Sequence, residues 1–274
     1  MGTRFAPSMT GYLHQGHLYH LIELYAIAQQ RGLPVSLRLE DHDLARSRPA
    51  YEEALFADLA AFGVRWEGEV IYQRDRMTHY DEQLAYLKAA GRVYGCACTR
   101  REIRAGCAEG EEAVYAGHCA DKELPLEGHA VRFRVLPGEQ RFLDERLGEQ
   151  IQRPTQQSGD FVLRDRMGQY SYHFAAVCDD IDEDISLVVR GRDLLAATGR
   201  QLQLYQAFGA TPPSYVHHAL ITDREGKKLS KRTWAESLRQ QLESGLSVEQ
   251  IIAQVLQLEQ PCSFQEAVDR VADR

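Results

Sequence analysis

Two histidines with a glycine between them stand near the start of the chain, in the stretch LHQGHL at residues 13–18, and a third follows at His20. Three roles are open to them. His14 and His17 could share one helix face and bind a metal ion, although no nearby carboxylate completes a set of ligands. They could be ordinary surface imidazoles. They could also donate hydrogen bonds to a phosphate at a helix start, where Gly16 lets a ligand approach the unpaired backbone N–H groups.

The lysines of the chain are concentrated in one short segment. Only five lysines accompany 27 arginines, and three of the five stand in GKKLSKR at residues 226–232. The segment follows a predicted strand and a glycine, as a loop does. Such a loop could bring Lys228 and Lys231 onto the phosphates of a nucleotide, where a point charge counters developing negative charge. A solvated basic turn is the alternative interpretation.

A second group of reactive side chains is a cysteine cluster. Four of the six cysteines, Cys96, Cys98, Cys107 and Cys119, fall within 24 residues. In a reducing compartment such a cluster favours a metal site over disulfides. Three thiolates from Cys96, Cys98 and Cys119 would need a fourth ligand to close the tetrahedron of a structural zinc site. Buried free cysteines without a metal are the alternative.

The spacing of apolar residues predicts the elements that position these groups. Residues 17–31 have helical spacing and are followed by Gly32, so the predicted helix begins at the histidines. The stretch PVSLRLED at 34–41 predicts a strand with a carboxylate pair at its end, and helical patterns follow at 50–62 and 78–90. Strand, loop, helix, strand and helix in this order are typical of a parallel α/β sheet.

This alternation is interrupted between 93 and about 160, where short β-like pieces alternate with Gly, Pro and charge. It resumes with a strand at 185–191, a helix at about 193–208 and a strand at 216–222. The last 40 residues look helical, and Ser247 with Gln250 predicts a capping box. The predicted fold is α/β, a Rossmann-like parallel-sheet nucleotide-binding domain with an inserted zinc-containing subdomain and a short helical C-terminal region. The predicted segments are 1–92 (first half of the Rossmann domain), 93–160 (zinc-binding, acceptor-like insertion), 161–235 (second half, with the lysine loop) and 236–274 (helical).

Composition excludes several classes of protein. Apolar residues at 44% and charged residues at 26% are ordinary for a globular chain. No stretch approaches eighteen consecutive apolar residues, and MGTRFAPS at the N-terminus lacks the apolar core of a secretory signal, so we expect a cytoplasmic protein without membrane partners. The net charge of −8 argues against unselective binding of polyanions but is compatible with a local basic face.

Taken together, RFAPSMTGYLHQGH near the start and KLSKR near residue 230 resemble the two signatures of class I aminoacyl-tRNA synthetases, an HxGH motif and a KMSKS-like loop. The RFAPS lead-in and the strand end RLED are similar to the glutamyl and glutaminyl branch. Within that branch the short chain, the pattern CAC with YAGHC downstream, and VVRGRDLL resemble the glutamyl-Q tRNA(Asp) synthetases, which lack the anticodon-binding region. The resemblance covers roughly residues 3–235.

This resemblance implies an ATP-dependent ligase that works in two steps. Glutamate and ATP would give glutamyl-adenylate and pyrophosphate without bound tRNA, and the glutamyl group would pass to the queuosine base in the anticodon of tRNA(Asp). We expect a monomer. Two alternatives stay open: a truncated glutamyl-tRNA synthetase paralogue that acylates another tRNA or acceptor, and a catalytically silent nucleotide-binding protein that kept the fold.

The resemblance also implies which residues bind the substrates. Arginines suit carboxylates because the guanidinium fork binds them at two points, and a carboxylate suits the amine. No general base is expected, because the attacking substrate carboxylate is already ionised at pH 7, which leaves alignment and charge stabilisation. The implied glutamate site comprises Arg4, Phe5, Ala6, Pro7, Ser8, Glu40, Tyr172 and Arg190. The implied ATP contacts, with Mg²⁺ on the phosphates, are His14, Gly16, His17 and Lys231, and the implied catalytic residues are His14, His17, Lys228 and Lys231.

For the cysteine cluster, the resemblance implies one structural zinc whose fourth ligand is Tyr115, four residues before Cys119. A phenol must lose a proton with an ordinary pKa of about 10, a cost that a bound cation lowers. Cys107 and His118 are better intrinsic ligands in the same segment and remain alternatives.

The sequence departs from the family pattern at several positions. Met9 replaces a proline, Gln15 replaces an apolar residue, and His173 replaces an asparagine beside Tyr172. The segment 101–113 is longer than the short connection usual in the subfamily.

Overall fold

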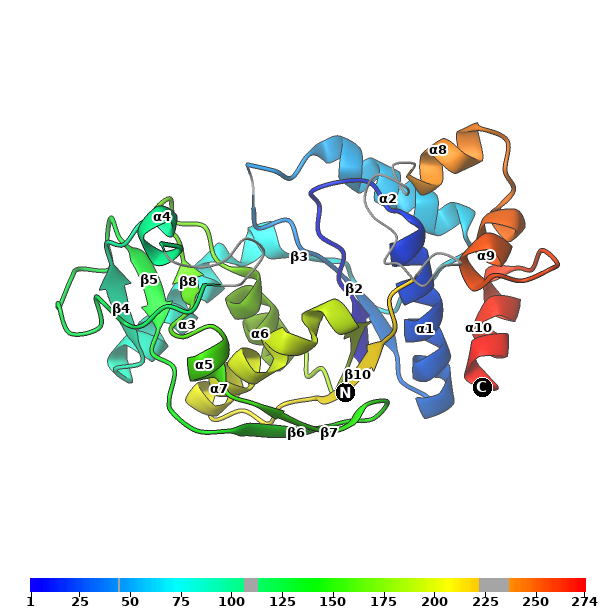
Figure 1. Cartoon of the computed structure of the whole chain (residues 1–274). Coiled ribbons are helices and arrows are strands. Elements are labelled where there is room, and N and C mark those ends of the chain that lie inside the picture. The colour runs from blue at the N-terminus through cyan, green and yellow to red at the C-terminus, as the bar shows by residue number, and fades with distance from the viewer. Residues whose placement is uncertain (44, 106–112, 222–236) are drawn as a thin grey trace. The chain divides into compact units, whose positions relative to one another are not determined.

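The computed structural model describes residues 1–43, 45–105, 113–221 and 237–274 (Figure 1). The chain forms two compact units, each made of separate stretches of sequence. The first unit comprises Met1–Arg74, Ile185–Asp193 and Tyr215–Arg274, and the second comprises Asp75–Asp184 and Leu194–Ser214. The division into four segments along the sequence stays a prediction.

The first unit is built on parallel strands, with the valine- and leucine-rich composition of strands buried on both faces. Strand β1 (Thr3–Phe5) pairs with β2 (Val35–Leu39), which pairs with β3 (Ile71–Tyr72), both in parallel. Strands β9 (Leu187–Gly191) and β10 (Ser214–His218) are neighbours in another sheet. A parallel bridge between Gly2 and Ile185 brings the chain before β9 beside the start of β1.

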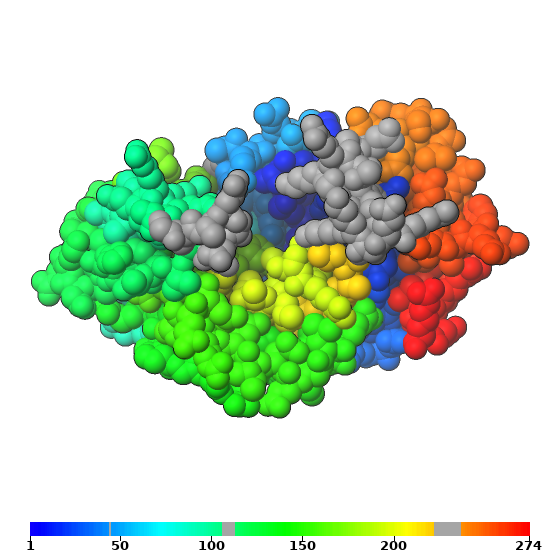
Figure 2. Space-filling model, viewed as in Figure 1, coloured from blue at the N-terminus to red at the C-terminus, as the bar shows by residue number. Residues whose placement is uncertain are grey.

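Helix α1 is the central helix of this unit. Its apolar side chains, among them Leu18 and Ile22, are fully buried, and it ends at Gly32, which has a left-handed φ of 60°. The last two helices, α9 and α10, orange-red to red in Figures 1 and 2, lie against α1. The capping box predicted at Ser247 and Gln250 is confirmed. The helices of this unit are α1 (Gln15–Arg31), α2 (Pro49–Ala61), α8 (Leu238–Glu243), α9 (Val248–Leu256) and α10 (Phe264–Ala272).

The second unit contains an antiparallel sheet and a separate core rich in aromatic side chains, with Tyr80, Phe133 and Phe174 fully buried. The sheet has the order β4, β5, β8, and β6 and β7 form an antiparallel hairpin. The strands are β4 (Val93–Cys96), β5 (Ala130–Phe133), β6 (Gln140–Asp144), β7 (Gly148–Gln152) and β8 (Val162–Arg164). The helices are α3 (Met77–Ala89), α4 (Arg100–Ile103), α5 (Pro154–Gln157), α6 (Tyr172–Asp182) and α7 (Thr198–Phe208).

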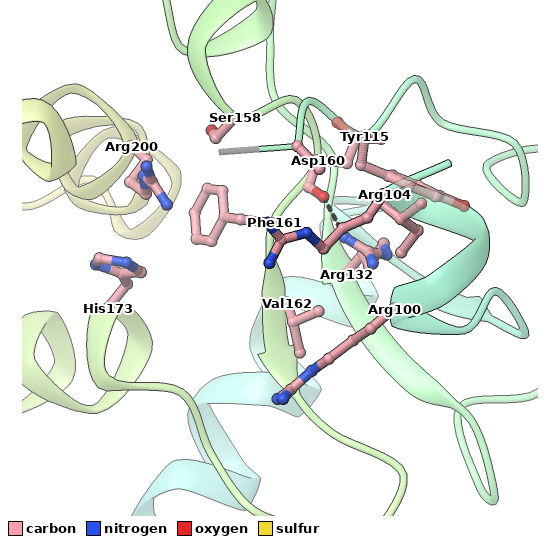
Figure 3. A pocket seen from close by; sticks show the side chains of 12 residues that line it. Arg100, Arg104, Tyr115, Arg132, Ser158, Asp160, Phe161, Val162, His173 and Arg200 are labelled. Carbon is pink, nitrogen blue, oxygen red and sulfur yellow. Dashed lines mark hydrogen bonds between the residues drawn. The ribbon is translucent and has the colours of Figure 1, made fainter. Parts of the chain in front are cut away.

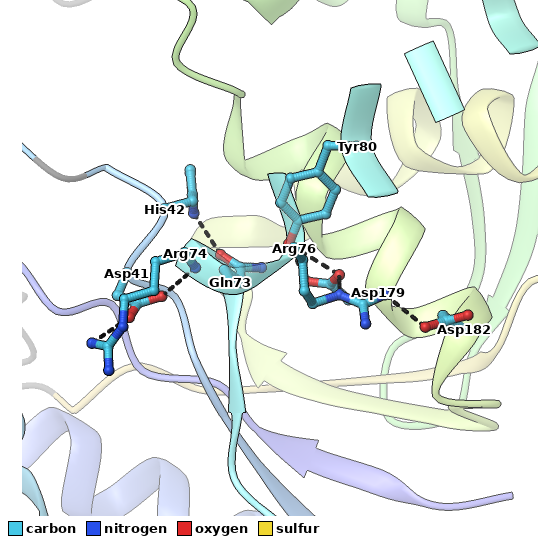
Figure 4. A network of polar contacts seen from close by, with 8 residues as sticks. All are labelled: Asp41, His42, Gln73, Arg74, Arg76, Tyr80, Asp179 and Asp182. Atoms are coloured by element: carbon cyan, nitrogen blue, oxygen red, sulfur yellow. Dashed lines mark hydrogen bonds and ion pairs between the residues drawn. The ribbon is translucent and has the colours of Figure 1, made fainter. Parts of the chain in front are cut away.

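The chain passes between the units four times, and two of these passages lie inside 3₁₀ helices, η1 (Gln73–Arg76) and η2 (Arg192–Ala197). Two arginines in η1 are bound within different units (Figure 4). In the first unit, the backbone N–H of Arg74 donates to Oδ1 of Asp41 at 2.8 Å, and its guanidinium lies 2.9 Å from Oδ2. In the second unit, Arg76 donates to Asp179 at 2.7 Å and to Asp182 at 2.6 Å, both in α6. Each end of η1 is therefore held by ion pairs of its own unit.

The predicted fold class is confirmed: an α/β chain with parallel strands, a cysteine-containing insertion and helices at its C-terminus. The predicted helix at 193–208 divides into η2 and α7, and α6 was not predicted. Within the described ranges, no helix has the length and hydropathy needed to cross a bilayer.

Candidate active site and cysteine cluster

His14 and His17 form the N-terminal cap of α1. Nδ1 of His14 accepts a hydrogen bond from the backbone N–H of Gly16 at 3.0 Å, and Nδ1 of His17 accepts one from the backbone N–H of His14 at 3.1 Å. The centroids of the two rings lie 3.9 Å apart. An imidazole whose Nδ1 accepts a hydrogen bond is neutral and carries its proton on Nε2. Both histidines therefore present an Nε2–H donor at the start of a helix.

The electrostatic environment keeps His17 neutral. Burial, and to a smaller extent the neighbouring imidazole of His14, lowers its pKa to about 3. In this arrangement neither histidine has a lone pair left for a metal ion, because Nδ1 accepts the cap hydrogen bond and Nε2 carries the proton. Donation to an anion is the role that this geometry supports.

Gly16 is required by the ring of His14. A Cβ atom at this position would lie 2.8 Å from Cε1 and 3.0 Å from Nδ1 of that ring, closer than real Cβ contacts. The glycine therefore allows the His14 side chain to fold over the helix end and cap it. This steric requirement accounts for a glycine between the two histidines.

The lysines of the predicted loop lie outside the described residues. Lys228 and Lys231 belong to 222–236, and their role stays a prediction. The described residues on both sides of that segment contact α1 or the residue before its cap. Before the segment, Nε2 of His218 is hydrogen-bonded to Nδ1 of His20 at 3.0 Å. After it, the backbone N–H of Leu238 donates to the carbonyl oxygen of Leu13 at 2.8 Å.

Gln15, the polar residue that replaces an apolar one, connects α1 to α8. Its side-chain amide donates to Oε1 of Gln241 in α8 at 2.8 Å, and Gln241 is buried. The departure from the family pattern therefore has a structural partner in this chain. Met9, another departure, is buried in the core of the first unit.

The residues implied for glutamate binding begin at the ends of β1 and β2. Ser8 and Glu40 form a parallel bridge, the Met9 N–H donates to the Glu40 carbonyl oxygen at 3.2 Å, and the Glu40 N–H donates to the Pro7 carbonyl oxygen at 3.0 Å. Arg4 is 5% exposed and Glu40 is 8% exposed. The backbone thus brings a buried arginine and a buried carboxylate to neighbouring parallel strands. Phe5 and Pro7 are also buried, and Ala6 is partly buried.

Arg190 lies in β9 of the same unit and is also buried. Its Nε donates to Nε2 of His217 at 2.9 Å, and its guanidinium lies 5.4 Å from the centroid of the Tyr215 ring. The hydrogen bond and the aromatic face fix the orientation of the guanidinium. Tyr172 is the first residue of α6 and belongs to the second unit, so its part in a glutamate site stays a prediction.

In the second unit three thiols and a phenol converge. The Sγ atoms of Cys96, Cys98 and Cys119 lie within 4.8 Å of one another, with 3.6 Å between those of Cys98 and Cys119. The Tyr115 hydroxyl lies 3.3 Å from Sγ of Cys96 and 3.6 Å from Sγ of Cys98, and it accepts the Cys119 N–H at 3.0 Å. The cluster could hold a metal ion. His118 is exposed and is not among the ligand groups gathered there within the described residues.

Cys107 lies outside the described residues, so its place as an alternative ligand stays open. The position of Tyr115 depends on a glycine. Gly159 has a φ of 61°, and a Cβ atom there would lie 2.0 Å from the Tyr115 carbonyl oxygen. Only glycine fits at this position. Because it lacks a Cβ atom, residues 158–160 can run against Tyr115, whose N–H donates to the Ser158 carbonyl oxygen at 3.0 Å.

Comparison with known proteins assigns the chain to a family. The family of class I tRNA synthetases (E and Q), catalytic domain, matches residues 1–257. The glutamyl-Q tRNA(Asp) synthetase of Chromobacterium violaceum is 42% identical over 238 residues, which is 86% of this chain and 80% of that protein. The enzyme of the same name from Neisseria gonorrhoeae is 40% identical over 240 residues, 86% of this chain and 81% of that protein. The chain belongs to the glutamyl-Q tRNA(Asp) synthetase family.

A solved structure supports the same fold for this family member. The glutamate-tRNA synthetase from Elizabethkingia anophelis is 25% identical, with a TM-score of 0.81 over 98% of this chain. The chain spans 65% of the length of that synthetase. The family signature at the start of α1 is thus found in a fold that larger class I synthetases share.

Two histidines beside the family signature were missed by sequence reasoning. His217 contacts Arg190, and His218 contacts His20; both are buried. The only signal in the sequence was the pair of adjacent histidines in the VHHALIT strand. Strand alternation predicts that one of them faces solvent, which would hold for a sheet exposed on one face.

Proposed function

We propose that this chain activates glutamate with ATP and transfers the glutamyl group to the queuosine base in the anticodon of tRNA(Asp). The carrying observation is the pair of neutral histidines at the start of α1, each of which accepts a backbone hydrogen bond at Nδ1 and so carries its proton on Nε2, in a chain of this family. A helix start with two added donors suits the phosphates of a nucleotide.

The chemistry of activation needs positioned charge and no base. A carboxylate oxygen of glutamate attacks the α-phosphorus of ATP, the bond to the β-phosphate oxygen breaks, and pyrophosphate leaves. His14 and His17 donate hydrogen bonds to the phosphates, and Lys228 and Lys231 add positive charge as negative charge develops. Mg²⁺ on the phosphates, when bound, neutralises the departing pyrophosphate.

The proposed glutamate pocket uses charges on the parallel strands. Arg4 and Arg190 bind the two carboxylates and Glu40 binds the ammonium group, with Ser8 and Tyr172 as neutral hydrogen-bonding partners. Burial of these three charged residues supports the proposal, because an ion pair strengthens where water is excluded. The guanidinium of Arg190, oriented by His217, would meet a planar carboxylate at two points.

We further propose that Cys96, Cys98, Cys119 and Tyr115 bind one structural zinc. A tetrahedron with Zn–S bonds of about 2.3 Å has S–S edges of about 3.8 Å, and with a Zn–O bond of about 2.0 Å its S–O edges are about 3.5 Å. The separations of 3.6 Å between two sulfurs and of 3.3 Å and 3.6 Å between phenol oxygen and sulfur are close to these edges. Bound zinc would crosslink β4 to the loop that carries Tyr115 and supply no step of the reaction.

Glutamate-dependent exchange of pyrophosphate into ATP, measured without RNA, tests the first step. Labelled glutamate is then incubated with total tRNA from cells that make queuosine, and the labelled nucleoside is identified after digestion. We expect the label on queuosine of tRNA(Asp) and none on an unmodified tRNA(Asp) transcript, which is the matched control. Label on the 3′-terminal adenosine would instead indicate a truncated glutamyl-tRNA synthetase paralogue. ATP binding without exchange for any amino acid would indicate a silent nucleotide-binding protein.

A further inference from the structure

The second unit contains a cavity of about 350 Å³ whose wall is rich in arginine (Figure 3). Side chains from five different elements and from widely separated parts of the sequence line it. In Figure 3, Arg200 and His173 reach in from α7 and α6, and the α4 side chains come from the opposite side. The charged and titratable lining residues are Arg100, Arg104, Arg132, Asp160, His173 and Arg200.

The lining has an excess of positive charge. Four arginines face one carboxylate, that of Asp160. This carboxylate is already engaged, since one oxygen accepts the Tyr94 hydroxyl at 2.6 Å and the other accepts the Val135 N–H at 2.8 Å. An anionic ligand is therefore the chemistry that the cavity favours.

Two of the four arginines in the cavity are buried and two are exposed. Arg132 is 7% exposed, donates to the Asp160 carbonyl oxygen at 2.6 Å, and stacks 3.8 Å above the Tyr115 ring. Arg200 is equally buried. Arg100 and Arg104 stand exposed at α4. A cavity that combines two buried arginines with two exposed ones suits an anion that extends beyond the cavity, such as a polymer backbone, better than an enclosed small anion.

We propose that this cavity binds a phosphodiester group of the RNA acceptor, a contact that rests on the proposed function because it takes tRNA as the partner. Guanidinium groups bind phosphate oxygens in two-point fashion. The cavity lies at the small end of ligand pockets, which suits one nucleotide unit and not a helix. A net charge of −8 disfavours binding RNA over the whole surface, so recognition requires a local cationic site of this kind.

Binding of queuosine-containing tRNA(Asp) to the full-length protein, measured by fluorescence anisotropy at several salt concentrations, tests the proposal. The variants are Arg104→Ala and Arg100→Ala. The matched control is Arg101→Ala, which removes the same charge from the same exposed helix but does not line the cavity. For each lining variant we expect Kd to rise about tenfold. The slope of the logarithm of the association constant against the logarithm of the salt concentration is negative, and its magnitude should decrease by about 0.7, the value for one single-stranded phosphate contact. For Arg101→Ala both changes should be clearly smaller.

Several results would overturn the proposal. Equal weakening by Arg101→Ala and Arg104→Ala would mean general charge attraction. If Arg100→Ala and Arg104→Ala keep native melting temperatures and native tRNA affinity, the proposed contact does not exist. If Arg104→Ala weakens the binding of AMP but not the binding of tRNA, the cavity binds a free nucleotide instead. Arg104→Lys, which keeps the charge and loses the fork, should fall between native and alanine. The proposed function fails separately, if the native protein shows no pyrophosphate exchange in the absence of RNA.

Discussion

The start of α1 and the cysteine cluster are both built from short motifs, but different interactions hold them. At α1, backbone N–H groups of His14 and Gly16 donate to the histidine rings, so the orientation of both rings is set before any ligand binds. In the cluster, the side chains of Cys96, Cys98 and Tyr115 face one another. The first site is thus preorganised by backbone geometry, whereas the second brings together groups that a bound cation would stabilise.

Burial has opposite consequences at the two sites. It lowers the pKa of His17 and so favours the neutral donor that a phosphate site needs. In the cluster, burial raises the pKa of the Cys98 thiol and of the Tyr115 phenol, and so disfavours the anions that bind a metal. A bound cation reverses that preference. The following predictions separate the two modes of organisation.

Removal of the metal should have the largest effect, confined to the second unit. Chelation should lower the free energy of unfolding there by about 4 kcal/mol if free zinc stands about a thousandfold above its Kd. Hydrogen exchange with mass spectrometry should show deprotection in β4 and β5, while α1 keeps its protection. Equal deprotection of α1, or none in β4, would contradict this difference between the sites.

Substitutions of the proposed zinc ligands test the same difference between the sites. Tyr115→Phe should weaken zinc binding at least about tenfold, because it removes one of four ligands, whereas Cys107→Ser should leave zinc affinity unchanged. Competition with a chromogenic chelator measures both affinities. The reverse result would make Cys107 the fourth ligand.

His17→Ala should lower glutamate-dependent pyrophosphate exchange roughly 100- to 1,000-fold, because it removes a preorganised donor to the phosphates. It also removes half of a capping box, at about 1 kcal/mol. Ser247→Ala breaks the capping box of α9 in the same unit and is the matched control: similar destabilisation and unchanged exchange are expected. If the two variants lose exchange equally, the histidine acts only as a cap.

Gly159→Ala should destabilise the second unit by about 2–3 kcal/mol, because the left-handed backbone is strained and the new methyl group meets the Tyr115 carbonyl oxygen. Zinc affinity should fall with it. Gly128→Ala is the control, since Gly128 has a φ of 70° and no atom lies within 4 Å of the place that its new methyl group would occupy. In the control, denaturant unfolding should therefore show only the cost of the strained backbone, and zinc titration should show native affinity. A native zinc affinity for Gly159→Ala would mean that Tyr115 is positioned in another way.

The range of the interactions decides what the sequence could predict. His14, Gly16 and His17 interact within four residues, and their motif predicted the helix start that the structure has, while their contact with phosphate stays a prediction. Tyr115, by contrast, is placed by Gly159, 44 positions later, and no local pattern links the two. The resemblance alone pointed to Tyr115.

Burial also limited how well the sequence predicted secondary structure. Helix α6 was missed although most of its residues, Phe174 to Asp180, are buried, since two of these buried residues are aspartates and the polarity of the segment does not reveal its burial. The arginine cavity was missed because α4, β5, β8, α6 and α7 contribute to it from positions 100 to 200. A single sequence shows neither kind of long-range convergence.

The dependence of stability on pH should be the smallest effect, and it belongs to the first site. The pKa of His17 is about 3 in the folded chain, below its ordinary value of 6.5. Below pH 6.5 the unfolded chain therefore binds a proton that the folded chain excludes, so the stability present above pH 6.5 is lost as pH falls toward 3. Because His17 is only partly buried, the loss between about pH 6.5 and 5 should be at most about 2 kcal/mol.

His17→Gln isolates this contribution, since glutamine occupies the same position in the capping boxes of α8 and α9 and can accept the same backbone N–H without titrating. Burial also lowers the pKa of His20, but that residue is present in both proteins and cancels in the comparison. Denaturant unfolding at about pH 7.5 and pH 5 should show a smaller loss for the variant than for the native chain. An equal loss would mean that His17 takes up its proton in the folded chain as readily as in the unfolded one, and the neutral phosphate donor would then have to be abandoned.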